Sequence, residues 1–146
     1  MPEITLVRYQ KRKSKKRRRL NVHKLRLETA QTPKQLRKKL DVYFSTYIRL
    51  RDKACFMDSG CSGPIQAGHL ITRGATRTRW DDRNCFGSCR GHNFLHEYRP
   101  EIMTQWYIGK YGIDQYNEIV RLSRISWKPT KSELLSLIER YKLIPS

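Results

Sequence analysis

The feature that most constrains the fold of this 146-residue chain is a set of cysteine and histidine residues in its middle third. Cys55 and Cys61 precede a glycine-rich segment, and Cys89 and His92 follow it in a Cys-x-x-His spacing. Two such residues at the start of a helix can hold one ion, and thiolate and imidazole are typical ligands of tetrahedral zinc. We therefore predict a structural zinc site that ties both sides of this segment together, because a chain with few strand residues gains stability from such a link.

A second ligand set is compatible with the same residues. Cys85 can replace His92, which gives a site made of Cys55, Cys61, Cys85 and Cys89. Its Cys-x-x-x-Cys spacing is less usual, so we favour the set with His92, and the fourth ligand stays open between the two. The remaining interpretation is four reduced, buried thiols, because disulfides are not expected in a chain without a secretion signal.

The charge of the chain predicts a polyanionic partner. There are 31 Lys and Arg against 13 Asp and Glu, a net charge of +18. Residues 1–32 carry eleven basic and two acidic residues, and residues 33–146 carry twenty and eleven, so each part has a net charge of +9. We predict a basic arm over 1–32 and one folded domain over 33–146, with nucleic acid as the partner. No apolar run of membrane-spanning length occurs, so we expect no membrane association and a cytoplasmic protein.

The arm contains the segment KRKSKKRRR, in which eight of nine residues are basic. Repulsion between these charges and the lack of apolar side chains predict that the arm is disordered on its own. Contacts of such an arm with phosphates add affinity and salt dependence but no sequence preference.

The folded part is predicted to be α+β. A helix is expected from Pro33 to Lys53, with Thr32 and Gln35 as a capping box. A hairpin of two short strands is expected within residues 55–84, followed by a short helix over residues 87–98. Further helices are expected over residues 100–111, 114–125 and 127–144. The apolar stripe of the first helix, which we assign to the core, comprises Leu36, Leu40, Tyr43, Phe44, Tyr47 and Leu50.

The order of polar residues around the predicted zinc site resembles that of the HNH nucleases. His69 comes first, Asn84 stands five residues before Cys89, and Asn93 follows His92 directly. The stretch NCFGSCRGHN matches the family pattern N-x4-C-x-x-[C/H]-[H/N] position by position, with His92 in place of a second cysteine. The resemblance implies an HNH core, which is a ββα-metal fold, flanked here by helices.

Three longer motifs narrow the resemblance. Over roughly residues 36–112 the chain is similar to the bacteriophage NinG (Rap) family of recombination nucleases. The similarity is carried by three segments in this order and spacing: YIRLRDKACFMDSGC, QAGHLITRG and RWDDRNC. The resemblance implies a metal-dependent endonuclease that acts on branched DNA, including Holliday junctions and D-loops, in the cytoplasm of an infected bacterium. It also implies recombination proteins as further partners. Two cuts are needed to resolve a junction, so we expect a homodimer or two sequential nicks.

By this resemblance, three residues carry the catalysis. His69 is the general base, which its near-neutral intrinsic pKa permits. Asn84 orients His69 by holding the hairpin, and Asn93 offers an oxygen to a catalytic Mg²⁺ or Mn²⁺. His96 and Glu97 are three and four residues beyond Asn93, so they can share its helical face and complete the cation site.

One position departs from the family pattern. Many HNH members have an acidic or histidine ligand just before the base, where this chain has Gly68. The cation would then rest on the Asn93 helix, on water and on the substrate phosphate, which Mg²⁺ tolerates because it retains several waters.

Basic residues of the arm and of the hairpin are the predicted contacts to DNA phosphates. Trp80 lies among them and is either a core residue or a stacking partner for an unpaired base. Two alternative functions remain at this point: a zinc-stabilised nucleic-acid-binding protein without activity, and an HNH nuclease acting on linear duplex DNA. The predicted contacts are Lys11, Arg12, Lys13, Arg17, Arg18, Arg19, Arg73, Arg77, Arg79, Arg83 and Arg90.

Overall fold

The computed structural model describes residues 13–19 and 30–142 of the chain. Residues 13–19 form a short, exposed helix, so the prediction of a disordered arm is not confirmed for this part. Its high lysine and arginine content suits a helix that is exposed on all sides, because these residues have good helix propensity. Lys11 and Arg12 lie outside the described residues.

The longest helix, α2, spans Pro33–Asp52, so it begins at the predicted residue and ends one residue before the predicted Lys53. The Thr32 hydroxyl accepts a hydrogen bond from the Gln35 backbone, and the Gln35 side chain accepts one from the Thr32 backbone. Lys53 adopts the left-handed conformation and ends the helix.

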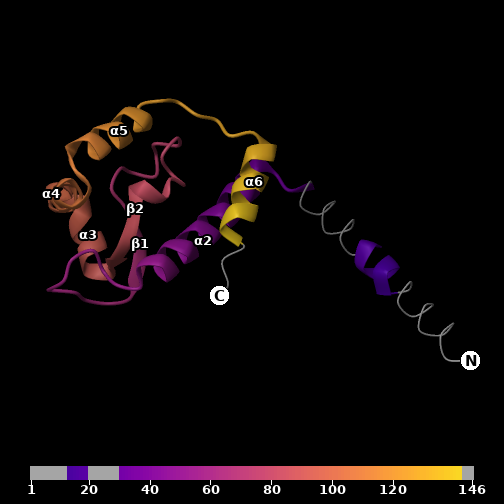
Figure 1. The fold of residues 1–146 in the computed structure, drawn as a ribbon, viewed down its shortest axis with the longest axis horizontal. Helices are drawn as coiled ribbons and strands as arrows, with labels where there is room; N and C mark the ends of the chain where they lie inside the picture. Colours follow the sequence, from indigo (N-terminus) through magenta and orange to yellow (C-terminus); the bar gives the residue numbers. More distant parts are fainter. Residues whose placement is uncertain (1–12, 20–29, 143–146) are drawn as a thin grey trace, which may run out of the picture.

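The buried face of α2 differs from the predicted stripe at one position. Leu36, Leu40, Phe44 and Ile48 are buried, whereas Leu50 is 38 % exposed. Ile48 takes the expected place of Leu50 because the buried side chains recur every four residues, along one ridge of the helix. This ridge packs against α6, which spans Lys131–Lys142, as Figure 1 shows.

The sheet consists of two antiparallel strands, β1 (Ile65–His69) and β2 (Cys85–Cys89), in which Ile65 pairs with Cys89 and His69 pairs with Cys85. The prediction that both strands lie within residues 55–84 is wrong, because the second strand begins at residue 85. All five residues of β2 are buried, so the strand lacks the polar–apolar alternation by which a half-buried strand is recognised. A long loop with a 3-10 turn over Asp82–Asn84 joins the two strands.

Three helices follow the hairpin. α3 (Arg90–Tyr98) starts at the end of β2, and α4 (Pro100–Tyr111) ends at Gly112, as predicted. α5 (Ile113–Ser123) packs on α4. The fold is therefore α+β, with a strand–strand–helix unit held between α2 and α4 (Figure 1). None of the helices in the described part is long and apolar enough to cross a membrane.

The core forms in two clusters, one on each side of the hairpin. The first joins α2 and α6 and includes Trp80, which is 5 % exposed and is thus a core residue. The second joins β2 to α4 through Phe86, Met103 and Tyr107. Gly87 permits the close approach of β2 to the end of α2, because a side chain there would collide with the Ala54 carbonyl.

We predict that replacing Leu40 by Ala lowers the free energy of unfolding by about 2–5 kcal/mol, since the side chain is fully buried and its loss leaves a cavity. Val42→Ala on the same helix is the matched control, because Val42 is 65 % exposed, and its effect should stay within about 0.5 kcal/mol. Urea unfolding followed by circular dichroism measures the free energy of unfolding of both variants. Equal effects of the two substitutions would contradict the placement of Leu40 in the core.

Candidate metal centre and adjoining cavity

Cys55, Cys61, Cys89 and His92 converge at the base of the hairpin. Their ligand atoms all lie within 4.8 Å of one another. The His92 Nδ1 is 3.2 Å from the Cys89 Sγ, 3.3 Å from the Cys55 Sγ and 3.9 Å from the Cys61 Sγ. The cluster thus joins the end of α2, the following loop, the end of β2 and the first turn of α3.

These distances match the edges of a zinc coordination tetrahedron. Bonds of about 2.3 Å to sulfur and about 2.0 Å to nitrogen give edges of roughly 3.5–3.8 Å at tetrahedral angles. Backbone N–H groups of Ser62 and His92 donate to the Cys89 Sγ, and the backbone N–H of Cys89 donates to the Cys55 Sγ. The donor set and its geometry can therefore hold a metal ion such as zinc.

The thiols have divergent acidities, as expected where several thiols crowd together. Burial opposes ionisation of Cys89, but the N–H groups of His92 and Ser62 outweigh it and lower its pKa to about 6. Desolvation and the neighbouring Cys55 and Cys89 sulfurs raise the pKa of Cys61 to about 11. A cation at this point would favour the thiolate form of all three, which metal binding requires.

Cys85 stands apart from this cluster. It is fully buried, and burial raises the pKa of its thiol to about 12. Its Sγ lies 3.8 Å from the His69 Nδ1, because the two residues are paired across the hairpin. The structure thus assembles the ligand set with His92 and leaves Cys85 out of it.

His69 ends β1 in a largely buried position. Its Nε2 lies 2.9 Å from the Arg79 carbonyl oxygen, which can only accept, so the ring carries its proton on Nε2. Burial lowers the pKa of His69, and the positive charges of Arg73 and Arg79 act in the same direction. The imidazole is therefore neutral at neutral pH, with its lone pair on Nδ1.

The loop that provides this carbonyl is fixed from two sides. Asn84 is fully buried, donates to the Ile71 and Thr78 carbonyls, and accepts a hydrogen bond from the Ile71 backbone. Asp41 of α2 holds the other side through both carboxylate oxygens.

The Asp41 carboxylate makes a two-pronged ion pair with Arg79, at 3.0 and 2.6 Å, and accepts a hydrogen bond from the Trp80 indole at 2.9 Å. Asp41 thereby sets the position of the Arg79 carbonyl that binds His69. The sequence reasoning missed Asp41, although an acidic residue in an otherwise basic stretch of helix is a signal that could have been followed.

His69, Asn93, His96 and Glu97 line one cavity of about 470 Å³ between the hairpin and α3. The structure thus brings together the predicted base and the three predicted cation ligands. The His96 Nδ1 is buried without a hydrogen-bond partner among the described residues. Among the described residues, His69, His96 and Glu97 do not bring their ligand atoms as close together as those of the cysteine cluster.

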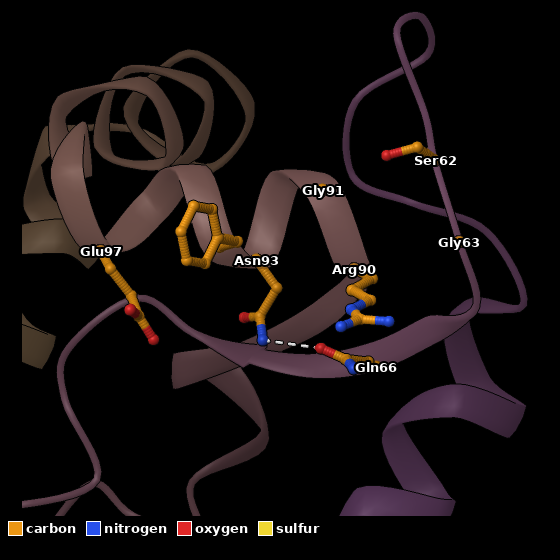
Figure 2. A pocket seen from close by; sticks show the side chains of 8 residues that line it. Ser62, Gly63, Gln66, Arg90, Gly91, Asn93 and Glu97 are labelled. Carbon is orange, nitrogen blue, oxygen red and sulfur yellow. Dashed lines mark hydrogen bonds between the residues drawn. The ribbon is translucent and has the colours of Figure 1, made fainter.

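A second cavity of about 660 Å³ adjoins the first, because Asn93 and Glu97 line both. Figure 2 shows Arg90, Asn93 and Glu97 on the same side of α3, above β1. The Asn93 amide donates to the Gln66 side-chain oxygen at 2.9 Å, which leaves the Asn93 Oδ1 free to face a ligand. Gln66 is a further residue that the sequence reasoning missed.

Gly68 lies close to side chains of α3 and β2. A Cβ atom at this position would lie only 3.0 Å from both the Asn93 Oδ1 and the Ser88 Cβ. A side chain just before His69 would therefore require these two side chains to shift by a few tenths of an ångström.

The arginine and lysine residues predicted to contact DNA differ in their exposure and in their ion pairs. Arg79 is half-buried and bound to Asp41, and Arg83 is paired with Asp81. Arg77 is exposed and lies over the Trp127 ring. Arg73 and Arg90 are exposed, one in each cavity, and neither makes an ion pair with the described residues. Lys13, Arg17, Arg18 and Arg19 are exposed on the helix of residues 13–19.

Comparisons of the chain with protein-family models, with curated proteins and with solved structures find no match. The resemblance to HNH nucleases and to the NinG family therefore stays a prediction from the motifs.

We predict that the purified protein holds one zinc ion per chain, that Cys89→Ala abolishes this binding, and that Cys85→Ala preserves it. Cys89 is a member of the cluster, whereas Cys85 lies outside it. Elemental analysis and the absorption of the cobalt-substituted protein measure the occupancy. Loss of the metal in Cys85→Ala, with retention in Cys89→Ala, would contradict this ligand set.

Proposed function

We propose that this protein is a metal-dependent DNA endonuclease of the HNH type, and that it cuts branched DNA such as Holliday junctions or D-loops. The observation that carries the proposal is that His69 and Asn93 line one open cavity. An anchored imidazole lines this cavity together with amide and carboxylate groups, which is the combination that phosphodiester hydrolysis needs.

His69 is the proposed general base. Its Nε2–H is engaged by the Arg79 carbonyl, so Nδ1 is the atom that accepts a proton from the attacking water. The Cys85 Sγ lies 3.8 Å from Nδ1, within reach of a weak hydrogen bond from the thiol, so the attacking water would have to displace this contact. Asn84 and Asp41 act as positioning residues, because they fix the loop that holds the ring.

Asn93, His96 and Glu97 are the residues that would hold a divalent cation. Amide and carboxylate oxygens suit Mg²⁺, and the added imidazole suits Mn²⁺ as well. The His96 Nδ1 is buried without a hydrogen-bond partner among the described residues, so its ring would have to turn for this atom to reach a cation in the cavity. A bound cation would supply the positive charge that stabilises the leaving oxygen. Zinc in the cysteine cluster would have a structural role only.

The substrate proposal rests on the charge of the surface and on the NinG-like motifs. Arg73 and Arg90 lie at the two cavities and can each contact a phosphate. A zinc-stabilised binding protein without activity, or a nuclease specific for linear duplex, would share this charge but differ in products. A single site cuts one strand, so junction resolution would need a homodimer or two successive nicks.

We expect wild-type protein to nick a labelled four-way junction in Mg²⁺ or Mn²⁺ and to leave linear duplex of the same sequence largely uncut. His69→Ala should lower the rate at least about 100-fold, the scale of general-base catalysis, while the affinity for the junction persists. His23→Ala, outside the described residues, is the matched histidine control and should remain active. If the wild-type protein binds DNA but never cuts it, the protein is a zinc-stabilised binding protein without activity. If it cuts linear duplex in preference to the junction, it is a nuclease specific for linear duplex.

The acid limb of the pH–rate profile provides a second test. A general base works only when neutral, and burial holds the pKa of His69 below its ordinary value of about 6.5. Activity should therefore persist as the pH falls to about 6.5 and decline only below it. The dependence of kcat/KM on pH, measured under constant cation and salt concentrations, gives the midpoint. A midpoint above 6.5 would show that another group is the base.

A further inference from the structure

Two aromatic side chains on α3 are exposed side by side. Phe94 is 60 % and Tyr98 is 67 % exposed, and their ring centroids are 5.1 Å apart. They are four residues apart and so share one face of the helix. Other aromatic residues of the domain, such as Trp80, Phe86 and Tyr107, are buried in the core. The exposed pair contributes little to the core and is available to a ligand.

Phe94 lies at the rim of the proposed active site. Phe94 lines the 660 Å³ cavity together with Arg90, Asn93 and Glu97, and two of these, Asn93 and Glu97, also line the cavity of His69. A group that covers the Phe94 ring would thus lie next to the strand being cut.

The charge of the surroundings identifies the kind of ligand. Arg90 is exposed in the same cavity and has no ion pair among the described residues, and the chain carries a net charge of +18. A ligand that combines a flat apolar face with negative charge would be attracted to this surface. A nucleotide with an unstacked base has both properties.

We propose that Phe94 and Tyr98 form a stacking site for an unpaired nucleobase, while Arg90 contacts a phosphate of the same strand. This inference rests on the proposed function and adds a binding site to it. Every base has a π face, so such a site tolerates any sequence but requires a base that is free of its duplex partner. The site selects DNA with unpaired nucleotides near the cut.

The test compares two DNA duplexes of the same sequence, one fully paired and one with a single bulged 2-aminopurine. Binding is measured by fluorescence without added divalent cation, so that no cutting is expected. Phe94→Ala/Tyr98→Ala should lose about five- to 100-fold in affinity for the bulged duplex, the range of stacking on one base, and little for the paired duplex. The wild type should quench the 2-aminopurine signal, as stacking requires.

Three further variants separate stacking from other roles. Phe94→Tyr/Tyr98→Phe retains both rings and should bind as the wild type does. Phe94→Leu/Tyr98→Leu retains apolar surface without a π face and should behave as the alanine variant does. Val42→Ser removes an exposed apolar group from α2 and should change nothing.

Full affinity of the leucine variant for the bulged duplex would overturn the stacking site. So would equal losses on both duplexes, or a wild-type dimer that the alanine variant converts to a monomer. Cutting assays on the junction distinguish the two proposals. If the wild type cuts but the aromatic variants bind normally, the stacking site is wrong and the nuclease stands. If the wild type selects the bulged base but cuts no DNA, the stacking site stands and the nuclease is wrong.

Discussion

The convergence of three thiols and one imidazole at the base of the hairpin is the constraint on which the rest of the structure depends. A two-stranded hairpin is marginal by itself in water, and this one has a helix at each end that must stay in register with it. Cys55 follows α2, and Cys89 and His92 begin α3, so a shared ion would fix both helices to the same strand. The position of Asn93, one residue beyond His92, then follows from the metal cluster.

The opposite end of the hairpin depends on polar contacts instead. His69 is oriented by the Arg79 carbonyl, and that carbonyl is fixed by Asp41 of α2 and by the buried amide of Asn84. Removing one partner of such a network leaves buried polar groups unsatisfied, which costs more than the bond itself contributes. One end of the strand–strand–helix unit is therefore suited to binding a metal, and the other end orients the His69 imidazole, which lines an open cavity.

The sequence predicted the parts of this arrangement that are local. The start of α2 followed from its capping box, and the four residues of the metal-type cluster formed one of the two sets that the spacing allowed. Contacts between residues distant in sequence were not predictable. Asp41 and Arg79 are 38 residues apart, and no short-range pattern connects them. The strand β2 was missed because it is buried throughout, and periodicity cannot distinguish such a strand from a buried helix.

The central claim is that His69 and a cation bound by the Asn93 helix share one site. Anomalous diffraction from crystals of the zinc-loaded protein soaked in Mn²⁺ tests it most directly, because the two metals are distinguished by their absorption edges. We expect a zinc peak among Cys55, Cys61, Cys89 and His92, and a manganese peak in the cavity between Asn93 and His69. A manganese peak elsewhere, or none, with the His69 ring turned away from Asn93, would contradict it.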